Sequence, residues 1–506
     1  MLEYTEYKFA NKRRNLLTKG VHPTGGASSG KIRDFALQET AVASGPEERI
    51  LSDDHIGEEQ REAECPESIS STTPDVATLA ELLTAFKTLR REAASPTALP
   101  IRPHATRLPS RDRAVSLLFL AAVRRFYGTH GGLQLSMERV CKGGPSECVS
   151  VRVLTASTGL SLAESVAHVA ERDGLALARA QVGRLRGFFS YSWTGTKLDE
   201  MLGAIEDVVV PLDDAAARVW VNMFCASQNL LAGAYLPADA AERAALKAAD
   251  PGGYAARKED TDRIFDDALS VAREVYFYAS PLVGTWLAPR HAFLSPQREA
   301  RGAPPEPWER RGAAAITRAW CLFELASALV HGCKLHVALS RADRDQFRRL
   351  LTDEFDAIAG IVAGIDARDA QISKVEDRGH ILPRIEALAP EGAGDAEDAG
   401  FGRVTALVAE ALRGWLVYAA KAELAALPAA EQGTSCLLSQ VGRLLQDQGK
   451  LGEAEPLLRA ALEGRREVLG ERHPNSLTSM DNLALLLRAQ GQAGGGGAAV
   501  PGGAGG

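Results

Sequence analysis

The chain has 506 residues, with 65 acidic and 58 basic side chains, so its formal net charge is −7. This mild acidity gives no electrostatic reason to expect a nucleic-acid partner. Hydrophobic residues at 45% and charged residues at 24% exclude a wholly disordered chain and a fibrous repeat. The length predicts roughly two to four folded units.

No segment is typical of a secretory signal or a membrane span. The first 20 residues include basic side chains but lack an apolar run followed by a small-residue cleavage site. The most apolar stretch, 114–123, has about half of the roughly 20 residues that a spanning helix needs. The seven cysteines lack the close pairing of a zinc site or disulfide scaffold. We expect a cytoplasmic protein with reduced cysteines, no metal and no membrane partner.

The first part of the chain, 1–110, is polar and contains an acidic run between Asp53 and Glu64. Such a composition buries too little apolar surface to offset the entropy of ordering, which predicts a flexible leader. One amphipathic helix is expected within it, over 76–91. Residues 111–186 follow as a helical lead-in, where Ser161 and Glu164 have the spacing of a capping box.

Strands alternate with helices over 187–345. Runs of strand-forming residues predict four strands, 188–193, 219–225, 275–280 and 334–339. Helices are expected over 198–209, 261–273 and 316–330. This alternation predicts an α/β domain with a flavodoxin-like, doubly wound parallel sheet that helices cover on both faces.

The rest of the chain is expected to be all-helical. Residues 346–430 form a connector that includes a helix over 404–426. In 431–492, the segments 441–449 and 483–491 align with an offset of 42 residues, and an amphipathic helix lies between them. A repeated helical hairpin of this kind predicts a solenoid. The last residues, 493–506, form a tail rich in glycine and alanine.

The repeat sequence over about 433–492 closely resembles the tetratricopeptide repeats of kinesin light chains, most clearly in the run LLQDQGKLGEAEPLLRAALEGRREVLG. The resemblance implies protein partners that bind to the repeats. The second repeat runs into the glycine-rich tail, whereas a solenoid normally needs at least about three repeats. Either these helices dock onto the preceding domain, or the sequence is an incomplete gene product; we favour the second interpretation.

Chemistry in the α/β domain is expected at the carboxyl ends of the strands, where doubly wound sheets bind ligands. Hydroxyl, thiol, amide and aromatic side chains fall at these ends. They are Ser190, Tyr191, Ser192 and Trp193 after the first strand, Cys225, Ser227 and Gln228 after the second, and Ser280 after the third. The alternative is that the strands simply pass into polar loops.

Glu324 is the only charged residue between Arg318 and Lys334, within an otherwise apolar helix. A carboxylate in such surroundings either pairs with a cation or has its pKa raised by loss of hydration. A raised pKa suits a group that protonates or polarises a substrate. The structural alternatives are an ion pair with Arg318 or a helix face left in water.

Two short motifs resemble those of Toll/interleukin-1 receptor (TIR) domains. The run FFSYSW (188–193) is similar to their first strand, and AWCLFEL (319–325) is similar to the Trp-Cys-x-x-Glu-Leu motif of their third helix. Together with VWVNMFCASQ (219–228), these runs resemble a TIR-like family of algae and other protists, and fungal heterokaryon-incompatibility domains share some of the same elements. Kinesin-light-chain-type repeats often follow the protist domain.

The resemblance implies an assembly module that associates with its own kind. In enzymatic TIR domains the glutamate of this motif cleaves the nicotinamide–ribose bond of NAD, so Glu324 is the candidate catalytic residue. Trp320 and Cys321 form its framework, and NAD is a substrate rather than a cofactor. Asn222 stands where the family has aspartate, and the Arg-Asp-x-x-Pro-Gly loop of receptor-type domains is not found.

Two functional hypotheses follow from these patterns. In the first, the chain is a signalling and interaction protein that combines a TIR-like assembly module with partner-binding repeats. In the second, the same module is an NAD hydrolase in which Glu324 is catalytic. Other chemistries have little support, because the sequence contains no glycine-rich phosphate loop, no Gly-x-Ser-x-Gly elbow and no His-Glu-x-x-His helix.

Overall fold

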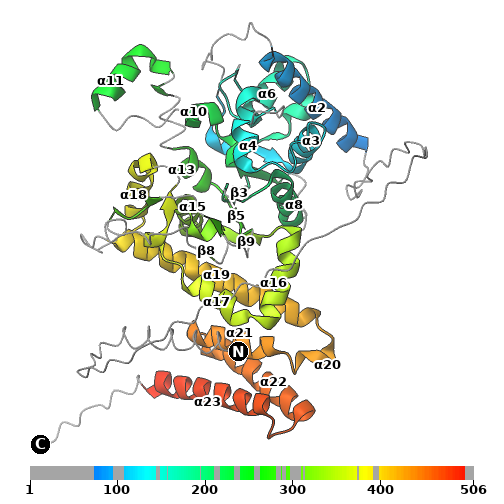
Figure 1. Cartoon of the computed structure of the whole chain (residues 1–506), viewed down its shortest axis with the longest axis vertical. Coiled ribbons are helices and arrows are strands. Elements are labelled where there is room, and N and C mark those ends of the chain that lie inside the picture. Colours follow the sequence, from blue (N-terminus) through cyan, green and yellow to red (C-terminus); the bar gives the residue numbers. More distant parts are fainter. Residues whose placement is uncertain are drawn as a thin grey trace, which may run out of the picture. The chain divides into compact units, whose positions relative to one another are not determined.

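The structure is a computed structural model. It describes residues 73–94, 107–143, 149–156, 158–193, 195–209, 217–232, 240–252, 254–255, 263–280, 286–287, 292–296, 309–310, 314–372, 375–390 and 398–495. Most of the predicted leader and the end of the glycine-rich tail, 496–506, lie outside these residues. Figure 1 shows the arrangement of the elements.

A six-stranded, mostly parallel sheet forms the centre of the α/β part, in the order β2-β1-β4-β3-β5-β9. Strands β4 (Arg218–Val221), β3 (Gly187–Ser190), β5 (Glu274–Tyr278) and β9 (Lys334–Ala338) are mutually parallel. The short strands β1 (Ala114–Ser116) and β2 (Val182–Gly183) continue the sheet in antiparallel fashion beside β4. The chain is therefore a mixed α/β protein.

Two small ladders lie apart from this sheet. Strand β6 (Trp286–Leu287) pairs with β8 (Glu309–Arg310), and β7 (Ala292–Phe293) pairs with β10 (Gln371–Ile372), both in antiparallel fashion.

The helix expected near 76–91 is present as α2 (Thr73–Ala93), and it is a packed element rather than part of a flexible segment. Its residues Leu82, Phe86 and Leu89 are fully buried. The Phe86 ring lies 5.6 Å from that of Phe119 on α3 (Leu117–Gly128). Burial of these side chains supplies the apolar area that holds α2 against the domain.

The predicted helical lead-in contains α3, α4 (Met137–Lys142), α5 (Val151–Leu154), α6 (Leu162–Arg172) and α7 (Ala176–Arg179). The capping box of α6 is confirmed, because the Ser161 and Glu164 side chains each bond the other's backbone N–H. Strands β1 and β2 were not expected here. They join this segment to the sheet, so it is part of the α/β body.

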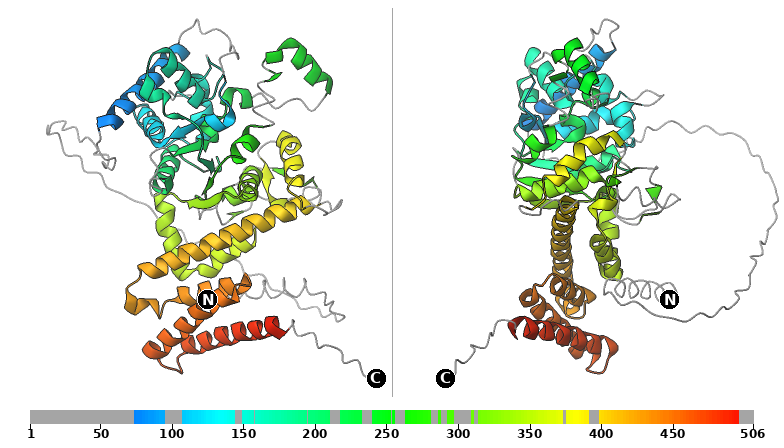
Figure 2. Two further views of the ribbon diagram at one scale, coloured as in Figure 1. Left: turned by 180° about the vertical axis from the view of Figure 1, so that it is seen from behind. Right: turned by 90° about the vertical axis from the view of Figure 1, so that its left-hand side faces the viewer.

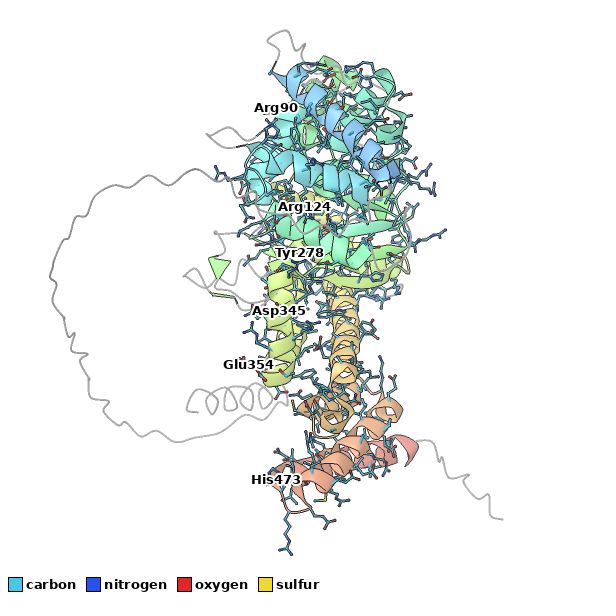
Figure 3. All side chains as sticks on the ribbon, turned by 90° about the vertical axis from the view of Figure 1, so that its right-hand side faces the viewer. Arg90, Arg124, Tyr278, Asp345, Glu354 and His473 are labelled. Carbon is cyan, nitrogen blue, oxygen red and sulfur yellow. The ribbon has the colours of Figure 1, made fainter. Side chains whose placement is uncertain are left out.

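Helices connect the parallel strands as the alternation predicts. They are α8 (Leu198–Val209), α9 (Asn222–Cys225), α10 (Gln228–Ala232), α11 (Ala240–Ala249), α13 (Ile264–Leu269), η3 (Ala314–Thr317) and α15 (Ala319–Val330). Arg124, labelled in Figure 3, donates from α3 to Asp199 at 2.9 Å and to Glu206 at 2.6 Å on α8.

The second parallel strand is shorter than the sequence predicts. Strand β4 ends at Val221, and residues 222–225 form the helical turn α9 instead of extended chain. The Val221 N–H donates to Cys225 Sγ at 3.3 Å, which satisfies a backbone donor that a continued strand would have directed to a neighbour. The apolar run alone did not reveal this turn.

The connector comprises α16 (Arg341–Asp353), α17 (Phe355–Ala363), η4 (Ala367–Asp369), η5 (Val375–Asp377), α18 (Arg378–Glu386) and the long α19 (Ala399–Ala426). After α20 (Ala429–Gln432) come α21 (Cys436–Asp447), α22 (Leu451–Leu469) and α23 (Pro474–Gly495). Figure 2 shows α19 between the α/β part and these last helices.

The repeat helices dock onto the connector, as one of the two interpretations of the shortened repeat array requires. Helix α21 packs against α19. Cys436 Sγ of α21 bonds the Thr352 carbonyl of α16 at 3.1 Å, and Lys421 of α19 pairs with Glu453 of α22 at 3.7 Å. None of the described helices is long and apolar enough to span a bilayer.

Candidate functional site

Glu324 lies at the carboxyl end of the central strand. Strand β3 ends at Ser190, whose hydroxyl donates a 2.6 Å hydrogen bond to Glu324 Oε2 of α15. Ser190 is fully buried and Glu324 is 6% exposed. Helix α15 is apolar on nearly every side and packs against β3 and β5, which carries the carboxyl group into the interior.

Burial determines the protonation of this carboxyl group. Loss of hydration raises the pKa of Glu324 to about 8 from 4.5, and the Ser190 hydrogen bond opposes the rise. Glu324 forms no ion pair with a described residue, and the nearby Arg318 acts instead on Cys321 and Asp377. Neither structural alternative, an ion pair with Arg318 or a helix face exposed to water, therefore describes this carboxyl group.

Cys321 is on the same face of α15, three residues before Glu324. Burial raises the pKa of its thiol well above the usual range, and the charge of Glu324 acts in the same direction. The Ser190 hydroxyl borders this thiol as well and opposes the rise. Ser190, Cys321 and Glu324 therefore form one compact group, which holds a proton on its carboxyl group near neutral pH.

Trp320 lies one helical turn before Glu324 on α15 and has partners of its own. Its indole Nε1–H donates to Asp377 Oδ2 at 3.3 Å, and its ring centroid lies 5.2 Å from that of Phe265 on α13. The side chain is half-buried against the core. Trp320 therefore anchors α15 to the connector and to α13.

A second group surrounds Tyr191, the residue that follows β3. Burial raises the pKa of the Tyr191 hydroxyl well above its usual range, and the charges of Cys141 and Glu324 add to the rise. The Cys141 thiol bonds Gln228 Oε1 at 3.5 Å, and Gln228 Nε2 donates to the Asn222 carbonyl at 2.9 Å. Tyr191 thus lies close enough to Cys141 and Glu324 for their charges to act on it, but no hydrogen bond in the described part of the chain joins it to either.

Cys225 belongs to a different environment. It is fully buried, and burial raises the pKa of its thiol to about 12. The charges that reach it are those of Arg113 and Glu164, a buried pair with Nε and Oε1 3.2 Å apart. A thiol with this pKa is a structural side chain rather than a nucleophile near neutral pH.

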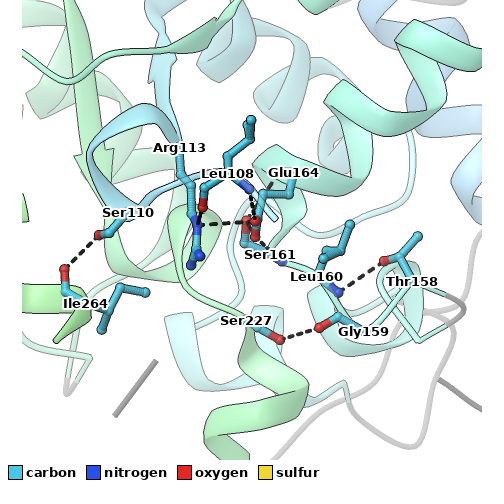
Figure 4. A network of polar contacts seen from close by, with 10 residues as sticks. All are labelled: Leu108, Ser110, Arg113, Thr158, Gly159, Leu160, Ser161, Glu164, Ser227 and Ile264. Carbon is cyan, nitrogen blue, oxygen red and sulfur yellow. Dashed lines mark hydrogen bonds and ion pairs between the residues drawn. The ribbon is translucent and has the colours of Figure 1, made fainter. Parts of the chain in front are cut away.

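The Arg113–Glu164 pair is the centre of a polar network that sequence reasoning missed (Figure 4). Glu164 accepts from the Leu108 N–H at 3.1 Å and from the Ser161 hydroxyl at 2.7 Å. Arg113 Nε donates to the Leu108 carbonyl at 2.8 Å. The capping box pointed to Glu164, but nothing in the sequence indicates a partner 51 residues earlier. The network fastens the start of the domain to α6.

The remaining candidate residues form hydrogen bonds with partners other than Glu324. The Ser280 hydroxyl accepts from the Ser340 N–H at 2.7 Å, where β5 and β9 end. The buried Ser192 accepts through its carbonyl from the Thr196 hydroxyl at 2.6 Å, and Trp193 is half-buried against the core. The strand ends therefore hold several separate polar groups rather than one continuous site.

No group of three or more metal-ligating side chains occurs among the described residues. At this edge of the sheet, the side chain best suited to acid–base or electrostatic catalysis is therefore Glu324. As a neutral acid it can donate a proton, and as an ion it can stabilise a positive charge in surroundings that favour such a charge.

The C-terminal helices form a second candidate site. Helices α21 and α22 make one close-packed hairpin, since a Cβ on Gly442 would lie 2.6 Å from Leu458 Cδ2. Arg465 of α22 is buried and donates to Ser439 of α21 at 2.8 Å and to Ser479 of α23 at 2.6 Å. One guanidinium thus joins all three helices.

Comparison with known families identifies these helices. The tetratricopeptide repeat family matches residues 433–494. No curated protein and no solved structure matches the chain. The C-terminal part therefore consists of tetratricopeptide repeats, which supports a role in protein–protein interaction. The match does not reach residues 187–345, whose resemblance to TIR domains stays a prediction.

Proposed function

We propose that this protein is an intracellular signalling and interaction protein, in which a TIR-like α/β module is joined to partner-binding tetratricopeptide repeats. The repeat match over 433–494 carries the interaction role. The TIR-like assignment rests on the Ser-Tyr and Trp-Cys-x-x-Glu motifs. It draws further support from the parallel strands, whose order in space is second, first, third, fourth, as in the first four strands of flavodoxin.

The repeats offer a face that packing leaves free. Arg443 on α21 and Leu485 on α23 occupy equivalent positions 42 residues apart, and both are exposed. Equivalent exposed positions on successive repeats line one surface of a solenoid, which is where such proteins bind their partners. We expect a partner segment to contact Arg443 and Leu485 together.

Affinity capture from the source cells tests this role. The full chain is compared with the double variant Arg443→Glu/Leu485→Glu and with the control Glu463→Lys, which changes an exposed side chain on α22. We expect proteins that the wild type and the control retain and the double variant loses. An identical set of captured proteins for all three chains would overturn the assignment of this face.

A second candidate function is NAD hydrolysis at Glu324, and one observation favours it: a buried carboxyl group bonded to Ser190 at the end of the central parallel strand. Hydrolysis breaks the bond between ribose and nicotinamide, adds water to the ribose carbon, and releases ADP-ribose, nicotinamide and a proton. Positive charge develops on the ribose as this bond breaks, so the ionised carboxylate is the form that stabilises the transition state.

Purified protein incubated with NAD, with nicotinamide release followed over a range of protein concentrations, tests this function. We expect release by the wild type and by Glu386→Gln, an exposed control, but not by Glu324→Gln. Because the pKa of Glu324 is about 8, kcat/KM is expected to rise with pH and level off above about 8. Absence of release at every concentration, or undiminished release by Glu324→Gln, would refute it.

A further inference from the structure

One face of α23 carries an apolar stripe that the described helices cover only in part, at Met480, which is half-buried and contacts Arg466 of α22. Four of its positions, spaced three, four and three residues apart, are Leu477, Met480, Ala484 and Leu487. Leu477 is 46% exposed and Leu487 is 42% exposed. The adjoining face of the helix packs on α22 through the buried Leu483 and Leu486. We call these four positions the α23 seam; its spacing is that of the a and d positions of a coiled coil.

The first repeat shows what packs on the equivalent face of α21. The positions 42 residues before Met480, Ala484 and Leu487 are Leu438, Gly442 and Leu445. There the two leucines are only 5% and 1% exposed, and α22 lies so close that Gly442 has no room for a side chain against Leu458. In α21 this face therefore accommodates a packed helix.

In the second repeat, the described residues include no helix after α23. The counterpart of α22 would begin at residue 493, and the sequence there, AGGGGAAVPGGAGG, has no leucine to match Leu458 or Leu462. At the end of the seam, a Cβ added to Gly491 would meet no atom within 4 Å. Over Leu477, Ala484 and Leu487 the seam is exposed among the described residues.

Charges beside the seam select the occupant. Asp481 and Arg488 flank it on the same side, seven residues apart, and both are exposed. They are both e positions when Leu477 is an a position. In an antiparallel pair of helices, e positions face e positions, so each Asp481 meets the other copy's Arg488. A parallel pair would not bring these charges together.

We propose that the seam binds the α23 helix of a second copy of this chain, antiparallel and about a two-fold axis. The Leu477, Met480 and Leu487 side chains fill the interface, and the small Ala484 lets the two helices approach closely at its centre. Two Asp481–Arg488 pairs border it. A two-fold contact of this kind is self-complementary and closes at a dimer. It is independent of any association through the α/β module.

The mass of the full-length chain in solution, measured by sedimentation or light scattering from about 1 to 100 μM, tests the proposal. Protein concentrations up to about 100 μM are needed because a single helix pair buries less than the roughly 1,000 Å² of a stable interface. We expect the mass of the wild type to approach twice that of the monomer. Leu487→Lys should remain monomeric, whereas Leu485→Lys, a matched change outside the seam on the same helix, should behave as the wild type.

Charge reversal tests the orientation. Asp481→Arg and Arg488→Asp should each weaken association at least about tenfold, and the double variant should restore it. Far-UV circular dichroism checks that each variant keeps its helices. A wild type that stays monomeric to 100 μM, or a dimer that Leu487→Lys leaves intact, would overturn the proposal. A dimer that the double variant fails to restore would overturn the antiparallel register.

Discussion

Replacing Glu324 with glutamine is expected to stabilise the protein, increasingly so as the pH rises. The native carboxyl group has a pKa of about 8, whereas its ordinary value is 4.5. Between these two pH values the unfolded chain has released the proton that the native state still holds. Unfolding therefore releases a proton, and native stability falls as the pH rises through this window.

The magnitude follows from the width of the window. Each pKa unit corresponds to between about 1 and 2 kcal/mol, so a difference of roughly 3 to 4 units amounts to about 5 kcal/mol at pH 8. Glutamine does not titrate and still presents an oxygen to the Ser190 hydroxyl. The advantage of Glu324→Gln over the wild type should therefore be near its minimum at pH 4.5 and grow steadily to pH 8.

Urea unfolding at pH 5, 6, 7 and 8 measures this difference. Five of the six tryptophans lie between residues 193 and 320, so tryptophan fluorescence reports mainly on the α/β part. Glu386→Gln, which changes an exposed carboxyl group, should show no growth with pH. If Glu324→Gln proves less stable than the wild type at pH 8, the native carboxylate is ionised and paired, and the reasoning from burial is wrong.

Three further substitutions test the packing. Gly187→Ala should cost about 1–3 kcal/mol in the tryptophan transition, because its Cβ would lie 2.3 Å from Tyr276 Cε2; an unchanged urea midpoint would show that the ring moves aside. Glu164→Gln should cost about 3–5 kcal/mol in the same transition by leaving the Arg113 guanidinium uncompensated, and a neutral result would contradict the buried pair. Arg465→Ala should cost about 1–3 kcal/mol, seen as faster hydrogen exchange in the repeat helices with the tryptophan transition unchanged; equal protection would argue against its bridging role.

The elements that the sequence predicted well are those with long periodic patterns. The helix over 198–209 matches α8 residue for residue, and the apolar run around Glu324 is α15. Strands β1 and β2, of three and two residues, are too short to show a period. Strand β4 was predicted too long because β-forming side chains also suit the buried turn α9.

The candidate site divides in the same way. An isolated acid in an apolar helix is visible in sequence, so Glu324 could be singled out. Its partner Ser190 lies 134 residues earlier, and only the strand order brings the two together. The buried Arg113–Glu164 pair could not be predicted, because Arg113 lies in a short segment whose sequence has no hydrophobic periodicity. Periodicity thus predicts which face of an element is buried, but not which polar groups meet there.

Helix α19 has a mechanical consequence. Its 28 residues span about 42 Å without a break. One part packs on α15, which carries Glu324, and another packs on α21, the first repeat helix. Arg348 of α16 bonds Glu423 of α19 at 2.9 Å and braces it from the side. A continuous helix resists bending, so a displacement of α21 would be passed along α19 to α15, the helix that carries Glu324.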